Sequence, residues 1–205
     1  MSQRLVLATR NQGKILELRR ILDAISHGTI ELVSVDQYPE IPDVEETGST
    51  FEENALLKAV AICKATGLPA IADDSGLCVD ALGGAPGIFS ARYSGVHGDD
   101  LANFNKVLDE LKGVEDAKRS AYFTCVTALV MPDGQQVTKV GEFHGFIAHA
   151  PVGEHGFGYD PIFLPQGSSI TSAQMSPHEK DLRSHRGISL RAIAPHVIEL
   201  LGSLR

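Results

Sequence analysis

A six-residue polar segment near the N-terminus has the composition and the setting of a phosphate-binding loop. It follows a short apolar run and precedes apolar residues at helical spacing. A helix that starts there would offer free backbone N–H groups and the positive end of its dipole to an anion. The segment lacks the GxxxxGK[ST] pattern of P-loop enzymes, and an ordinary strand-to-helix turn with solvated side chains is the alternative. Its members are Thr9, Arg10, Asn11, Gln12, Gly13 and Lys14.

Four carboxylates have the chemistry to hold a divalent cation. Glu45 and Glu46 lie in an acidic loop marked by prolines, and Asp73 and Asp74 follow a short apolar run. Because side chains alternate along a strand, we expect one aspartate to face the core and the other to face a ligand at the sheet edge. Hard oxygen ligands suit Mg²⁺, which keeps several waters and bridges to phosphates. A capping or turn role for Asp74 and Ser75 is the alternative.

A segment with two glycines around an aromatic residue, Gly156–Pro161 (GFGYDP), has the composition of a site for a flat ligand. The glycines predict a mobile or sharply turned backbone. An exposed Phe157 or Tyr159 there would stack on a nucleobase. An aromatic side chain that covers the edge of the core is the alternative.

A basic segment, Ser184–Gly187 (SHRG), lies between two predicted helices, and Lys180 precedes it. Arg186 and Lys180 have the chemistry to bind a base-edge acceptor or a phosphate. A solvated basic helix end, which the helix dipole stabilises, is the alternative.

Hydrophobic periodicity predicts the elements that would position these residues. The predicted strands are Arg4–Ala8, Glu31–Val35 and Ala70–Ala72, with a long hairpin of Ala121–Met131 and Gln135–Ala148. The predicted helices begin at Gly13 or Lys14, run from Thr50 to Thr66, span Leu101–Leu111, follow Ser176, and span Ile188–Leu201. Strands and helices mixed with an antiparallel hairpin indicate an α+β protein or an α/β protein with a mixed sheet.

Polar and proline residues mark the ends of several predicted helices. Thr50 with Glu53 makes a capping box, and Ser176 with Glu179 makes a second one that has proline at the first helical position. Pro195 lies inside the last predicted helix, and we expect it to kink or split that helix.

The composition restricts the class of partner. The chain has 205 residues and a formal net charge of -8, so its average surface repels polyanions and a nucleic-acid polymer is not expected as a partner. No stretch approaches the roughly 20 apolar residues that span a bilayer, so no membrane is expected. Three cysteines without metal-ligand spacing are typical of a reducing cytoplasm.

Taken together and in this order, five segments resemble the inosine triphosphate pyrophosphatase family, also called XTP/dITP diphosphatases. The resemblance covers the chain from Leu5 to about Leu200. The segments are ATRNQGK, VEETGSTFEENALLKA, ADDSGLCVDALGGAPGIFSARYSG, GFGYDPIF and SHRG.

The resemblance implies one nucleoside-triphosphate pyrophosphatase domain over residues 1–205. It implies an α/β fold with two lobes, a central mixed sheet flanked by helices, and an active site in the cleft between the lobes. It also implies a homodimer. The family splits a nucleoside triphosphate into a monophosphate and pyrophosphate with Mg²⁺, and its substrates ITP, dITP, XTP and dXTP are removed before they enter DNA or RNA.

The same resemblance assigns roles to individual residues. Glu45 and Asp74 would serve Mg²⁺, with Asp74 also the general base, and Lys14 and Lys58 would bind phosphate. Arg10 stands where some relatives have glycine. The substrate-binding set would be Thr9 to Lys14, Ser75, Phe157, Gly158, Tyr159, Asp160, Lys180, His185 and Arg186.

Substrate selection is expected at the base. Hypoxanthine and xanthine present a 6-keto acceptor, whereas adenine presents a 6-amino donor, which an arginine such as Arg186 cannot pair with. Guanine also has a 6-keto group, so this argument does not exclude GTP. A pyrophosphatase for other nucleotides, such as modified pyrimidines, is the first alternative. A nucleotide-sensing module is the second, although a sensor needs no catalytic acids such as Glu45 and Asp74.

Overall fold

The computed structural model describes residues 3–202 and divides the chain into two compact units. Unit 1 comprises Met1–Asp74, Cys125–Gly141 and Arg186–Arg205, and unit 2 comprises Ser75–Thr124 and Glu142–His185. Each unit is described by itself below. No helix among residues 3–202 is long and apolar enough to cross a membrane.

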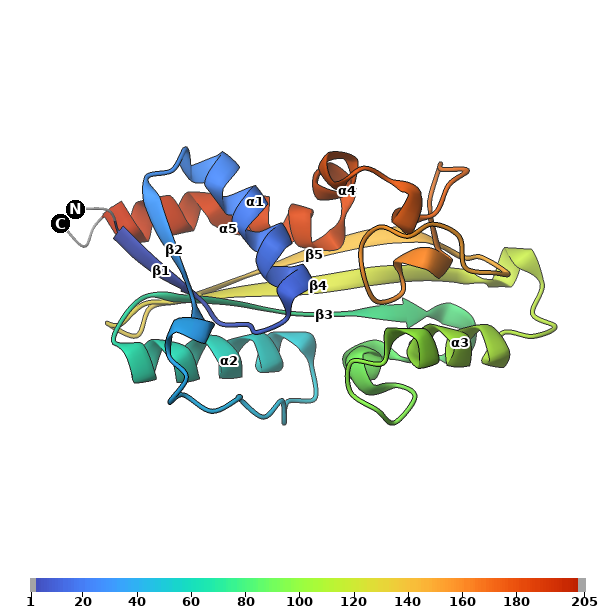
Figure 1. The fold of residues 1–205 in the computed structure, drawn as a ribbon, viewed down its shortest axis with the longest axis horizontal. Coiled ribbons are helices and arrows are strands. Elements are labelled where there is room, and N and C mark those ends of the chain that lie inside the picture. The colour runs from blue at the N-terminus through green and yellow to red at the C-terminus, as the bar shows by residue number, and fades with distance from the viewer. Residues whose placement is uncertain (1–2, 203–205) are drawn as a thin grey trace. The chain divides into compact units, whose positions relative to one another are not determined.

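Six strands form one sheet in the order β2-β1-β3-β4-β5-β6. β1 is parallel to both β2 and β3, whereas β5 and β6 are antiparallel, so the sheet is mixed. The predicted α/β fold with a mixed sheet and flanking helices is therefore confirmed (Figure 1). The strands are β1 Gln3–Leu7, β2 Ile30–Ser34, β3 Ala70–Val79, β4 Ser120–Val130, β5 Gln136–Ile147 and β6 Phe163–Pro165.

Five α-helices accompany this sheet in the described part of the chain. In unit 1, α1 and α5 lie on one side of the strands and α2 lies on the other (Figure 1). The helices are α1 Gln12–Ser26, α2 Phe51–Thr66, α3 Asp100–Glu110, α4 Pro177–Arg183 and α5 His185–Gly202.

Alternation along the strands gives unit 1 a core on each face of its sheet. Leu5 and Leu7 of β1 pack with Ile71 of β3 and with apolar side chains of α1 and α5. Val6 and Ala72 point the opposite way and pack against α2. Because the side-chain period of a strand is two, the next residues of β3 must continue this alternation. Asp73 therefore shares the α1 and α5 face with Ile71, and Asp74 shares the α2 face with Ala72.

The core of unit 2 lies around the other ends of the long strands. Leu77 and Val79 of β3 pack with residues of α3, β4, β5 and the segment that leads into β6. Arg119 is buried nearby, and its guanidinium donates to the carbonyls of Leu111, Ile147 and Ala148. These three bonds tie the end of α3 to the end of β5.

The predicted helix starts are close to the observed ones. α2 spans Phe51–Thr66 with Thr50 as its N-cap, as the sequence predicts. The Thr50 hydroxyl accepts from the Glu53 N–H, and the Glu53 carboxylate accepts from the N–H and the hydroxyl of Ser49. The second predicted box, at Ser176 and Glu179, has both bonds.

Two predicted boundaries are wrong, and of the kink or split expected at Pro195 the split does not occur. β3 does not end before Asp73 but continues to Val79. The strand tolerates two aspartates in its middle because cations pair with both and the amide of Asn54 also binds Asp74. α5 begins at His185, so the SHRG segment includes a first helical turn and is not a loop. Pro195 lies inside this 18-residue helix, so it does not split the helix.

Candidate active site

Asp73 lies in a fully buried network of charges in unit 1. Its side chain is 0% exposed, and its Oδ2 atom accepts from Arg186 Nε at 3.2 Å and Nη2 at 3.0 Å. Lys14 Nζ lies 3.1 Å from the same oxygen. Burial alone would raise the pKa of Asp73, but Lys14, Arg186 and Lys58 hold that pKa well below its ordinary value. Asp73 is therefore an ionised anchor for two cations.

Helical spacing on α1 explains how this network forms. Lys14 and Glu17 are three residues apart, so they occupy the same face of the helix. Glu17 is buried and accepts from Arg186 Nη1, while Lys14 pairs with Asp73. Arg186 is only 1% exposed and occupies the first turn of α5. The network thus joins α1, β3 and α5 on one face of the sheet.

Asp74 lies on the opposite face of β3 and contacts α2. Its Oδ1 atom accepts from Lys58 Nζ at 3.2 Å, and its Oδ2 atom accepts from Asn54 Nδ2 at 3.2 Å. Lys58 also donates to Glu46 Oε1 at 2.6 Å. Asn54 and Lys58 are four residues apart on α2 and therefore project from one face. One ammonium group is shared by two carboxylates here.

The electrostatics of Asp74 differ from those of its neighbour. Burial raises the pKa of Asp74; Lys58 and Lys14 lower it, Glu46 raises it, and the net shift is upward. Burial would lower the pKa of Lys58, but Asp74 and Glu46 outweigh it and raise that pKa. A carboxylate with a raised pKa beside a charged lysine is suited to accept a proton from a bound water.

Asn54 also holds the end of the acidic loop. Its Oδ1 atom accepts from the Gly48 N–H at 2.8 Å, while its amide donates to Asp74. A Cβ atom at Gly48 would lie 2.7 Å from Asn54 Oδ1 and from Glu53 Cβ, so only glycine permits this approach. The glycine of the EETGS segment therefore has a packing role next to the site.

The predicted phosphate segment has the expected helix start. α1 begins at Gln12, and the N-cap Asn11 accepts the Lys14 N–H at 3.0 Å. Thr9 Oγ1 accepts the Asn11 N–H at 3.2 Å. These two side chains fix the backbone, and Gly13 lies in the first turn of the helix. The Lys14 side chain is 14% exposed.

Arg10 connects this segment to the acidic loop. Its Nη2 atom donates to the Ile41 carbonyl at 2.7 Å, and its Nε atom lies 3.3 Å from Asp43 Oδ1 and 3.9 Å from Asp36 Oδ1. Gln12 Nε2 also reaches Asp36 at 3.5 Å. Both side chains therefore face the loop that carries the predicted metal ligand.

The carboxylates of this face fit a magnesium ion that is held mostly by its substrate. No group of three or more His, Cys, Asp or Glu residues among those described has the arrangement of a metal site. Mg²⁺ commonly uses one or two carboxylates together with substrate phosphates and water, so the sparse donor set is suitable. Glu45 is exposed, and the carboxylate beside Lys58 and Asp74 is that of Glu46. The role of Glu45 stays a prediction.

The predicted base-binding residues form a separate group in unit 2. Asp160 Oδ2 accepts from the Phe157 N–H at 2.9 Å and from Lys180 Nζ at 2.5 Å. The Lys180 ammonium lies 5.0 Å from the centre of the Phe157 ring. Phe157 is partly exposed, whereas Lys180 and Asp160 are buried. The structure therefore brings three of the predicted residues together: Phe157, Asp160 and Lys180.

Two other predicted contacts lie in the interior of unit 2. Tyr159 is 4% exposed and its hydroxyl donates to the Ser90 carbonyl, so its side chain supports the loop from the core. His185 is buried and stacks on Phe123 with ring centres 4.7 Å apart. Ser75, the first residue of unit 2, is partly exposed. Direct substrate contacts of these residues, of Gly158 and of Arg186 stay predictions.

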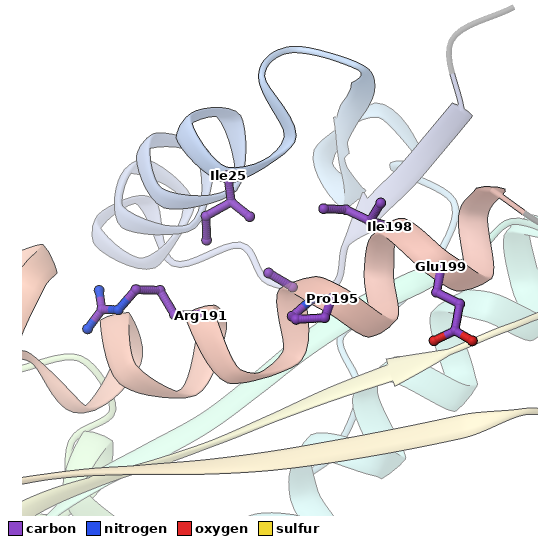
Figure 2. A pocket seen from close by; sticks show the side chains of 6 residues that line it. Ile25, Arg191, Pro195, Ile198 and Glu199 are labelled. Atoms are coloured by element: carbon purple, nitrogen blue, oxygen red, sulfur yellow. The ribbon is translucent and has the colours of Figure 1, made fainter.

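An apolar depression of about 550 Å³ in unit 1 is distinct from these groups. Ile25 of α1 points toward Pro195 and Ile198 of α5, and Arg191 and Glu199 lie at its ends (Figure 2). None of the predicted site residues lines it, so we do not assign the substrate to it.

Comparison with known proteins identifies the family. Residues 5–196 match the Ham1 family. The chain belongs to the Ham1 family. A relative from Streptomyces avermitilis, named dITP/XTP pyrophosphatase, is 57% identical over 97% of this chain and 99% of its own length. Another of that name, from Mycobacteroides abscessus, is 48% identical over 97% of this chain and 96% of its own.

Solved structures of Ham1 proteins have the same fold. The HAM1 protein from Coxiella burnetii superposes with a TM-score of 0.85 at 42% identity, covering 96% of this chain and 99% of that one. The Ham1 protein from Staphylococcus aureus gives a TM-score of 0.83 at 41% identity, covering 95% and 98%. The resemblance inferred from the five segments is therefore confirmed for the Ham1 family.

Two polar residues at the site, Asn54 and Glu17, were not singled out by the sequence. Asn54 and Glu17 are buried side chains on the apolar faces of helices, which is the signal that could have indicated them. Glu46 was noted among the acids, but its partner Lys58 lies 12 residues away and no local pattern joins them. Long-range pairs of this kind require the folded chain.

Proposed function

We propose that this Ham1 protein hydrolyses the non-standard purine nucleotides ITP, dITP, XTP and dXTP to the monophosphate and pyrophosphate. The names of its relatives, which match nearly the whole chain, support this substrate class. The reaction would remove these nucleotides from the pool before polymerases incorporate them.

The observation that carries the chemistry is the position of Asp74, whose two carboxylate oxygens accept from Lys58 and Asn54. Asp74 orients the attacking water and takes its proton, because its two oxygens are fixed by α2. Lys58 and Lys14 reach partly exposed positions and neutralise charge on the phosphates. Asp73 takes no direct part and keeps Lys14 in place.

Asp74 with Glu45 or Glu46 would hold Mg²⁺ on this face. Carboxylate oxygens are the ligands that this ion prefers, and substrate phosphates would complete its coordination. The ion would supply positive charge against the phosphates and lower the pKa of a water. Within unit 1, Asp74 pairs with one ammonium that Glu46 shares, so the face keeps negative charge for a cation.

The group around Phe157 would receive the base. Its partly exposed ring offers a stacking surface, and Lys180 beneath that ring holds Asp160 in place. Lys180 and Arg186 are donors, which match a 6-keto acceptor and not a 6-amino group. In this structure Arg186 donates to Asp73 and Glu17. To donate directly to the 6-keto group of the base, it would have to give up one of these bonds.

Pyrophosphate release from ITP, XTP, GTP, ATP and CTP, with and without Mg²⁺, tests the proposal. We expect release from ITP and XTP that is lost when the metal is chelated, and much slower release from ATP. Faster turnover of a modified pyrimidine triphosphate than of ITP would instead favour the alternative enzyme. Tight ITP binding without release would favour a sensor.

The remaining expectations about partners belong to the same proposal. We expect a cytoplasmic homodimer, the state that the sequence resemblance implies, and sedimentation of the purified chain measures it. The net charge of -8 supports a free nucleotide rather than a nucleic-acid polymer as the partner.

A further inference from the structure

The loop that carries Phe157 is fixed at its next residue by a carboxylate from α3. The Gly158 N–H donates to Asp100 Oδ2 at 2.7 Å. Asp100 is the first residue of α3, and its chain position is 58 residues from Gly158. The bond has an ionised acceptor, which makes it stronger than a bond between neutral groups.

The neighbouring residues of the loop have anchors of a different kind. The Phe157 N–H donates to Asp160 within the loop, and the Tyr159 hydroxyl donates to the buried Ser90 carbonyl. Asp100 is exposed, unlike Asp160 and Tyr159. Its removal therefore takes away one anchor without opening the core of unit 2.

The backbone around Phe157 makes this anchor important. Gly156 has φ of +78° and Gly158 has φ of +63°, both in the left-handed region. Glycine reaches many other conformations at little cost, so these residues do not hold the loop in place by themselves. A bond to the Gly158 N–H restricts the loop directly next to the aromatic ring.

We infer that Asp100 is a positioning residue for the base: it holds Phe157 ready to stack by fixing the Gly158 backbone. The inference rests on the proposed function, in which Phe157 receives the base. Asp100 binds the loop of unit 2 that carries Phe157, so its effect is expected on the base side of the substrate. A loop ordered before binding loses less entropy when the base stacks.

The test is Asp100→Ala, with IMP formation from ITP measured at saturating Mg²⁺. We expect KM for ITP to rise about three- to tenfold, as the loss of one exposed charge-assisted bond predicts, with kcat within about twofold of wild type. The inhibition constant of inorganic tripolyphosphate, which has no base, should not change. A higher KM for ITP with an unchanged inhibition constant for tripolyphosphate would distinguish an effect on base binding from a general loss of structure.

Two further variants control for the helix end. Asp99→Ala removes the neighbouring carboxylate, which accepts the Ala102 N–H at 2.9 Å as the N-cap of α3. It should lower the melting temperature without raising KM for ITP. Asp100→Asn keeps an acceptor for the Gly158 N–H, and its KM should return toward the wild-type value.

Each other outcome overturns the inference. An unchanged KM in Asp100→Ala shows that the anchor is dispensable, and an equal rise in Asp99→Ala shows that only the helix end matters. A parallel rise in the inhibition constant of tripolyphosphate shows that Asp100 acts on the phosphates. Wild-type protein that forms no IMP overturns the proposed function itself, and the inference with it.

Discussion

Asp73 and Asp74 are adjacent in sequence, yet β3 places them in opposite electrostatic environments. Asp73 pairs with two cations, Arg186 and Lys14, and its pKa is lowered. Asp74 pairs with one cation, Lys58, which also serves Glu46, and its pKa is raised. Burial raises the pKa of both carboxyls, so the nearby charges decide the sign: Arg186 lowers the pKa of Asp73, and Glu46 raises that of Asp74.

The difference indicates a division of roles between the two faces of β3. A buried carboxylate that is fully compensated stays ionised and contributes to the fold. A carboxylate that shares one cation keeps a tendency to take up a proton and to attract a further cation. The difference supports the proposal in which Asp73 belongs to the structure of the site and Asp74 belongs to its chemistry.

The largest effect is expected for Asp73→Ala. Arg186 is 1% exposed and would keep its charge after losing the carboxylate oxygen that accepts from both its Nε and its Nη2 atoms. Breaking a buried ion pair from one side costs about 3–5 kcal/mol of unfolding free energy. Urea unfolding measures this loss. The lowered pKa of Asp73 also means that its contribution is present above about pH 4, the ordinary aspartate pKa, and declines as the pH falls below that value.

A second variant sharpens the same test. Arg186→Met removes the cation, and the double variant with Asp73→Ala should cost clearly less than the sum of the two single losses. Additive losses would show that Asp73 and Arg186 do not depend on each other, and the assignment of Asp73 to the structure would be wrong.

Asp74→Asn is expected to act on the rate and not on the fold. Asparagine keeps an oxygen for Asn54 but cannot take a proton, so kcat should fall by about 10²-fold or more. The melting temperature should stay close to that of wild type, since Lys58 keeps Glu46 as a partner. Turnover within a few-fold of wild type, still dependent on Mg²⁺, would remove Asp74 from the chemistry and end the contrast with Asp73.

Lys14 pairs with Asp73 on one face of β3, and Lys58 pairs with Asp74 on the other, so substrate binding by lysine variants compares the two faces. Replacing either with Met should weaken ITP binding about ten- to hundredfold, as the loss of a charged hydrogen bond predicts, while inosine binding changes little. Only Lys14→Met should also lower stability clearly, because Lys14 compensates the fully buried Asp73. Calorimetric titration with both ligands measures this, and equal losses for ITP and inosine would contradict a phosphate role.

The parts of this contrast that the sequence could predict are local. Alternation along β3 predicts that the two aspartates face opposite ways. The spacing of apolar residues along α1 and α2 places Lys14 and Lys58 on the sides of these helices that face the sheet. The partner of Asp73 could not be predicted, because Arg186 lies 113 residues away. Its segment looked like a solvent-exposed basic turn until the fold placed it at the start of a buried helix.

The same limit applies in unit 2. A glycine-flanked aromatic segment could be recognised, but its two aromatic residues have different environments. Tyr159 is buried, and its hydroxyl donates a hydrogen bond to the carbonyl of Ser90, which lies 69 residues away. Phe157 remains partly exposed over Lys180. Sequence spacing alone gave both residues the same prospect of stacking on a base.

The smallest effect is expected for Arg10→Gly, which removes the side chain that contacts the acidic loop. Arg10 binds Ile41 and Asp43 of the acidic loop, and its ion pairs are partly exposed, so each contributes at most about 1 kcal/mol. Because this loop continues to Glu45 and Glu46, its loosening should raise the Mg²⁺ concentration for half-maximal activity about two- to fivefold. Titration of activity with Mg²⁺ at saturating ITP measures the change.

The control for this prediction is Arg10→Lys, which keeps the charge but loses the planar group that reaches the Ile41 carbonyl and Asp43 together. If Arg10 acts on the acidic loop, lysine should behave like glycine in the Mg²⁺ titration. If Arg10 instead binds phosphate as a charge, lysine should preserve the wild-type KM for ITP while glycine raises it, with no change in the Mg²⁺ requirement. The second result would place Arg10 among the cations that contact the substrate, and it would no longer be a residue that positions the proposed metal ligands.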